Sequence, residues 1–108
     1  MSPPGKVLLV KMIKEITLQF AKYHYDEYLK KEKIEKIEDR DIEEAIKTMW
    51  THQRKKELGE IIRENMKKFL KEDYSTFIIE GIISEMFMDD NLAIGRIQTE
   101  IKAYQQNK

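Results

Sequence analysis

Apolar side chains recur every three or four residues along most of this chain, which is the spacing that places them on one face of an α-helix. In the N-terminal part they stand at Leu9, Ile13, Ile16, Phe20 and Tyr23. Glycine occurs four times and proline twice, and no long stretch alternates strictly between apolar and polar residues. The pattern therefore predicts an all-α protein.

The apolar spacing also predicts where the first helices lie. The first should start near Gly5, and propensity alone extends it to about Ile37. Asp41, with Glu44 three residues later, forms a capping box that predicts the start of a second helix. The apolar stripe keeps nearly the same phase on both sides of a polar stretch at residues 52–57. We therefore expect one long helix over residues 42–71, loosened at most at Gly59.

The C-terminal third predicts two shorter helices. Residues 77–88, capped by Asp73 or Ser75, are apolar on most sides, so the rest of the bundle or a partner must cover them. A last helix, capped by Asn91, should run into a tail that frays at residues 105–108. We expect a single domain, with a helical bundle over residues 1–73 and a C-terminal helical arm over residues 74–108.

Composition narrows the classes of function. The chain of 108 residues has 20 basic and 20 acidic residues, no cysteine and 41% apolar residues. Zero net charge argues against generic nucleic-acid binding, and the lack of cysteine excludes disulfides and thiolate metal sites. No apolar run approaches the roughly 18 residues of a membrane span. Residues 1–20 show no recognisable signal peptide or mitochondrial presequence.

No arrangement of side chains predicts catalysis. His24 and His52 lack the spacing of a metal site, and no phosphate-binding loop or nucleophile triad is present. Residues 90–101 resemble a calcium loop, but apolar residues occupy ligand positions. The basic stretch at residues 54–56 is followed at once by Glu57, which favours a solvated face over phosphate binding. We expect a protein that is not an enzyme and binds no metal.

The most informative stretch is the aromatic pattern F-x-x-Y-x-Y-x-x-Y at residues 20–28. Tyr23 and Tyr25 lie about 200° apart around a helix, so one stripe cannot contain both. Either the helix bends here, or its aromatic side chains serve two surfaces. An aromatic core cluster and a partner-binding surface both remain open.

The order of several motifs resembles the LYR-motif family, and within it the small helical subunits of mitochondrial cysteine desulfurase complexes. The resemblance rests on Val7-Leu8, on Leu9-Val10-Lys11 in place of Leu-Tyr-Arg, on the aromatic run 20–28, on Glu57-Leu58-Gly59-Glu60-Ile61, and on Tyr74-Ser75-Thr76 followed by Ile78-Ile79-Glu80. It covers roughly residues 6–80. The chain departs from the family in having Val10 and Lys11 at the signature, and in its neutral charge.

The resemblance implies an antiparallel three-helix bundle, here with a C-terminal helical extension and with helix breaks near residues 21–24 and 38–41. It also implies an acyl carrier protein as partner, whose acyl-phosphopantetheine enters between the helices. The residues expected to contact the carrier protein are Lys6, Leu9, Val10, Lys11, Lys14, Lys30, Lys31 and Lys33. The acyl chain would lie against Ile13, Ile16, Phe20, Ile46, Met49 and Trp50, which would equally make an ordinary core. Tyr23, Tyr25, Tyr28, Tyr74 and Phe77 are the candidates for contacts with a larger partner.

The function implied by the resemblance is that of a non-catalytic adaptor in the mitochondrial matrix. With an acyl carrier protein it would stabilise a cysteine desulfurase for iron–sulfur cluster assembly. One alternative is an accessory subunit of a large mitochondrial complex, such as a respiratory complex or ATP synthase. Another is a generic helical scaffold outside mitochondria.

Overall fold

Five helices make up the described part of the chain in the computed structural model, and no strand occurs there. The structure describes the backbone of residues 5–70, 73–88 and 90–107, and the side chains of residues 5–70, 75–85 and 95–107. The helices are α1 (Lys6–Lys31), α2 (Asp39–Met49), α3 (His52–Asn65), α4 (Asp73–Met88) and α5 (Asp90–Gln106). The prediction of an all-α protein is confirmed.

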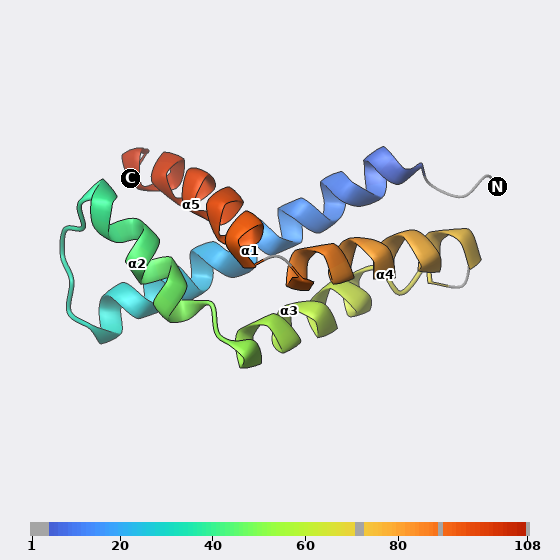
Figure 1. The fold of residues 1–108 in the computed structure, drawn as a ribbon, viewed down its shortest axis with the longest axis horizontal. Coiled ribbons are helices and arrows are strands. Elements are labelled where there is room, and N and C mark those ends of the chain that lie inside the picture. Colours follow the sequence, from blue (N-terminus) through green and yellow to red (C-terminus); the bar gives the residue numbers. More distant parts are fainter. Residues whose placement is uncertain (1–4, 71–72, 89, 108) are drawn as a thin grey trace.

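The chain crosses the molecule three times (Figure 1). Helix α1 runs along most of the length, α2 and α3 return in the opposite direction, and α4 and α5 run back in the direction of α1. α1 contacts all four other helices, while α2 packs on α5 and α3 packs on α4. The result is an elongated body of 48 × 27 × 21 Å.

Helix α1 is continuous, so the break expected near residues 21–24 is wrong. It also ends before Ile37, at Lys31. Lys33 adopts a left-handed conformation with φ 57°, and its N–H donates to the carbonyl of Lys30. The N–H of Ile34 donates to the carbonyl of Leu29 at 2.9 Å. This pair of bonds is a Schellman motif, which satisfies the last carbonyls of α1 and turns the chain into the loop before α2.

The long helix expected over residues 42–71 is also wrong, because the chain breaks between α2 and α3. Thr51 has an extended backbone, and its hydroxyl oxygen accepts a hydrogen bond from the N–H of Arg54. Thr51 thus acts as an N-cap, which starts a new helix instead of continuing the old one. The capping box at Asp41 is wrong as well, because α2 begins at Asp39 and Asp41 lies within its first turn.

One hydrophobic core runs through all five helices, and each pass of the chain contributes to it. Its buried members include Leu9, Ile13 and Tyr25 from α1, Ile46 from α2, Leu58 and Ile62 from α3, Ile79 and Ile83 from α4, and Ile97 and Ile101 from α5. The segment predicted as a C-terminal arm therefore packs against the other helices. The cap proposed at Ser75 is wrong, because Ser75 lies within α4 and its buried hydroxyl has no hydrogen-bond partner among the described residues. The side chains of Asp73 and Asn91, the other proposed caps, lie outside the described residues.

Candidate functional site

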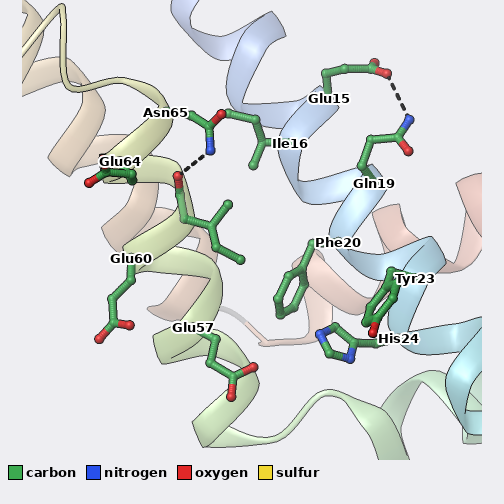
Figure 2. A pocket seen from close by; sticks show the side chains of 11 residues that line it. Glu15, Ile16, Gln19, Phe20, Tyr23, His24, Glu57, Glu60, Glu64 and Asn65 are labelled. Atoms are coloured by element: carbon green, nitrogen blue, oxygen red, sulfur yellow. Dashed lines mark hydrogen bonds between the residues drawn. The ribbon is translucent and has the colours of Figure 1, made fainter.

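A groove of about 890 Å³ lies between α1 and α3. Figure 2 shows α1 and α3 forming its two walls, with Phe20 pointing into the space between them. Ile16, Phe20 and Ile61 form its apolar surface. The other lining residues are Glu15, Gln19, Tyr23, His24, Glu57, Glu60, Glu64 and Asn65. The lining spans residues 15–24 of α1 and 57–65 of α3, which corresponds to about 12–14 Å of helix on each side.

An interaction between α1 and α3 lies at the end of the groove where His24 stands. Arg54 of α3 hydrogen bonds to Nδ1 of His24. Because a guanidinium group can only donate, the Nδ1 atom must accept, and the imidazole is neutral. The ring of Phe20 packs edge-on against His24 at 4.4 Å between centroids. Burial, and then the positive charge of Arg54, lower the pKa of His24 below its ordinary value of 6.5.

The groove is strongly acidic. Four glutamates line it and no lysine or arginine does. Glu57 extends toward Phe20 and His24, whereas Glu60 and Glu64 extend from the edge of α3 that faces away from α1 (Figure 2). Among the cations on α3, Arg54 bonds to His24 at one end of the groove, and Lys56 and Arg63 line a second pocket together with Glu60. The groove therefore combines an apolar floor with negative charge on both sides, which suits a partner with the opposite charge.

The expected acyl-chain residues divide between the core and this groove. Ile13, Ile46, Met49 and Trp50 are buried in the core, while Ile16 and Phe20 also line the groove. The indole N–H of Trp50 is buried without a hydrogen-bond partner among the described residues. An acyl chain would have to displace core side chains to contact all six residues. Over Ile16 and Phe20 it could lie in the groove without such a rearrangement.

The residues expected to contact a carrier protein fall into two groups. Lys6, Lys11 and Lys14 are exposed near the start of α1, beside Val10, which is partly buried, and Leu9, which is fully buried. Lys30, Lys31 and Lys33 are exposed at the other end of α1. About 24 Å of helix separates Lys14 from Lys30, so the structure does not bring the two groups into one surface.

The aromatic residues expected to bind a larger partner also differ in accessibility. Tyr23 is 62% exposed and Phe77 is 80% exposed, whereas Tyr25 is fully buried. Tyr28 is partly buried against the core, and the side chain of Tyr74 lies outside the described residues. In this structure Tyr25 cannot contact a partner, because its ring fills the space between α1 and the C-terminal part of α5.

The acidic side chains of the groove were missed by the sequence analysis. Glu57, Glu60 and Glu64 are spaced by three and four residues, a spacing that places them on one face of a helix. This spacing can be read from the sequence. That Glu15 of α1 lines the same groove follows only from the tertiary structure.

Other kinds of site find no support among the described residues. They contain no group of three or more acidic, histidine or cysteine side chains placed to hold a metal ion. Nor does that part of the chain contain a helix long and apolar enough to cross a membrane. Comparison with models of protein families, with curated proteins and with solved structures finds no match.

Proposed function

We propose that this protein is a non-catalytic helical adaptor that binds an acyl carrier protein. In the form that the sequence resemblance suggests, it stabilises a mitochondrial cysteine desulfurase for iron–sulfur cluster assembly. The acyl-phosphopantetheine would be carried by the partner, and the catalysis would belong to the desulfurase. The observation that carries the proposal is a basic and partly apolar surface at the start of α1.

This surface has the composition that an acidic helix would recognise. Val7 is 84% exposed and Leu8 is 48% exposed, although both are apolar. Lys6, Lys11 and Lys14 are exposed around them, and Lys11 and Lys14 lie on the side of α1 opposite the buried Leu9. The resemblance implies a carrier protein with acidic helices. Lysines would attract it over a distance, and the exposed apolar side chains would be covered on binding.

The adaptor role agrees with the chemistry of the groove. His24 lines the groove beside its carboxylates, and its Nδ1 lone pair accepts the hydrogen bond from Arg54. That lone pair is therefore not available to take a proton from a substrate. Carboxylates on an open helix face suit recognition of a charged partner.

The experiment is a titration of the chain with acyl carrier protein by isothermal calorimetry at low salt. Two variants with equal charge change separate the two lysine groups. Lys6→Glu, Lys11→Glu and Lys14→Glu together should weaken binding by about tenfold or more. The matched variant Lys30→Glu, Lys31→Glu and Lys33→Glu should bind as the wild type does.

Each outcome has a consequence for the proposal. If the wild type fails to bind holo- and acyl-carrier protein, the carrier-binding function is refuted. If both triple variants bind normally, the basic surface is not the docking site. Where the carrier protein binds, adding a purified desulfurase and measuring sulfide production tests the role in cluster assembly, and an unchanged rate would contradict that role.

A second candidate function is an accessory subunit of a large mitochondrial complex. Phe77 favours it, because a phenylalanine that is 80% exposed on α4 is suited to a contact with a neighbouring subunit. Isolation of the chain from its source, followed by native mass spectrometry, would identify the third component. A respiratory or ATP synthase subunit there would favour this candidate, and a desulfurase would contradict it.

A further inference from the structure

We propose that the groove between α1 and α3 docks a basic amphipathic helix of a partner protein. This goes beyond the carrier-protein proposal, because it uses a different surface and requires a partner segment of the opposite charge. The basic surface at the start of α1 would recruit an acidic protein, and the acidic groove would recruit a basic one. The two surfaces would let one short chain join two different partners.

The charge of the groove argues for a basic occupant. Its four glutamates come from both walls, with Glu15 on α1 and Glu57, Glu60 and Glu64 on α3. His24 is neutral, and the Arg54 guanidinium bonded to its Nδ1 places one positive charge beside the lining, against four glutamates in it. An acidic segment placed here would meet like charges at close range, whereas lysines or arginines flanking an apolar stripe would meet opposite charges.

The exposed apolar side chains of the groove favour contact with apolar side chains of a partner. Tyr23 is 62% exposed and Ile61 is 38% exposed, and both line the groove beside Phe20. These side chains come from two different helices, and the described part of the chain leaves them exposed. Burying them would remove apolar area from water, which is the main favourable contribution to association.

The two walls favour a helix over an extended peptide. Both walls are α-helices, whose backbone N–H and C=O groups already bond within the helix. An extended segment would find no backbone partners in the groove, so its amide groups would depend on water and on side chains for hydrogen bonds. A helix brings its own hydrogen bonds and can lay apolar residues at i, i+3, i+4 and i+7 along the floor. The groove is long enough for about two turns of such a helix.

A synthetic peptide tests this without knowledge of the natural partner. The probe is a fluorescein-labelled peptide of about 18 leucines and lysines, with leucine at helical spacing. The controls are the same pattern with glutamate in place of lysine, and a scrambled leucine–lysine order that has no apolar face. Fluorescence anisotropy measures binding to the full chain at low and at moderate salt.

The variants test whether the peptide lies in the groove. Glu57→Gln, Glu60→Gln and Glu64→Gln together should weaken binding by about tenfold at low salt. The matched control replaces three exposed glutamates elsewhere in the chain, with Glu35→Gln, Glu44→Gln and Glu100→Gln, and should bind normally. Tyr23→Ala should also weaken binding, and its exposed side chain can be removed without disturbing the core. Thermal melting of each variant verifies that it is folded.

The proposal is overturned if the wild type does not bind the basic peptide, if the acidic or scrambled peptide binds equally well, or if both glutamine variants lose affinity alike. A second outcome would also overturn it: the protein dimerises, and the dimer competes with the peptide for the groove. If Lys6→Glu, Lys11→Glu and Lys14→Glu together abolish both the dimer and this competition, the occupant of the groove is a second copy of the chain. That variant should otherwise bind the peptide normally. Failure of carrier binding therefore remains distinguishable from failure of this proposal.

Discussion

Replacing Tyr25 with alanine should destabilise the fold severely, although the same change at Tyr23 should do almost nothing. Tyr25 is fully buried, and its hydroxyl group donates a hydrogen bond to the side-chain oxygen of Gln105 in α5 at 3.3 Å. The neighbouring bond from the Tyr104 hydroxyl to a carboxylate oxygen of Asp26, at 2.6 Å, joins the same two helices. The ring of Tyr25 therefore connects the first and last passes of the chain.

The magnitude follows from the volume of the ring. Removing a buried aromatic side chain costs about 3–5 kcal/mol, because the lost transfer energy is added to the cost of a cavity. Tyr25→Phe keeps the ring and loses one long hydrogen bond, so it should cost about 0.5–1 kcal/mol. For a domain of this size, 1 kcal/mol corresponds to about 4 °C in melting temperature. Tyr25→Ala should then lower the melting temperature by roughly 12–20 °C.

The assay is urea and thermal unfolding followed by far-UV circular dichroism, with Tyr23→Ala as the matched control. The control removes the same ring from a side chain that is 62% exposed, and it should change the free energy of unfolding by about 0.5 kcal/mol or less. Equal destabilisation by both variants, or a melting temperature for Tyr25→Ala within a few degrees of the wild type, would refute the assignment of Tyr25 to the core.

A pH titration tests the same burial independently. Burial, followed by the nearby charge of Asp26, raises the pKa of Tyr25 to about 12 from its ordinary value of 10.0. The folded protein holds the phenolic proton at a pH at which the unfolded chain releases it. This contribution to stability is complete below pH 10 and is lost as the pH rises through 12. The absorbance of tyrosinate should show one late-titrating group that Tyr25→Phe removes, and its ionisation near pH 10 in the folded wild type would contradict the burial.

Two smaller predictions concern a helix end and a histidine. Lys33→Gly should stabilise the protein by about 0.5–1 kcal/mol in urea unfolding, because glycine adopts the left-handed conformation of the Schellman motif without steric cost. Lys33→Ala is the control, and an equal gain in stability from alanine would contradict this explanation. The lowered pKa of His24 means that the unfolded chain binds a proton more readily, so stability should be present above pH 6.5 and should fall as the pH is lowered below it. The free energy of unfolding between pH 7.5 and 5.5 should therefore fall further in the wild type than in His24→Gln, and parallel curves would exclude His24 as the cause.

The helical class and much of the core could be predicted because they depend on local pattern. Leu9, Ile13 and Phe20 have helical spacing, and all three are buried. The same reasoning misplaced the helix ends. Propensity predicts that the helix continues through residues 32–37. Instead α1 ends at Lys31, because Lys33 adopts a left-handed conformation that is unusual for a residue with a Cβ atom. Likewise, Thr51 is a good N-cap, but an apolar pattern that keeps its phase hides the break.

The candidate site was harder to predict than the fold, because it depends on which helix faces which. The glutamates of α3 have a periodic spacing, yet nothing in their spacing says that Glu15 and Phe20 lie opposite them. The lysines show the converse. Lys14 and Lys30 were both expected to contact the carrier protein because both have the required charge, whereas a continuous α1 separates them by about 24 Å.

Local chemistry alone makes this chain helical: few glycines and prolines interrupt it, and apolar residues return every three or four positions. It also determines that Tyr23 and Tyr25 point to opposite sides of α1, since they lie about 200° apart. Which of the two is buried was decided by the packing of the other helices. α5 packs along α1 and covers Tyr25. Tyr23 lies on the side of α1 that faces the groove and stays exposed there. Both side chains are aromatic and equally suited to burial, so only contacts between segments distant in sequence could distinguish them.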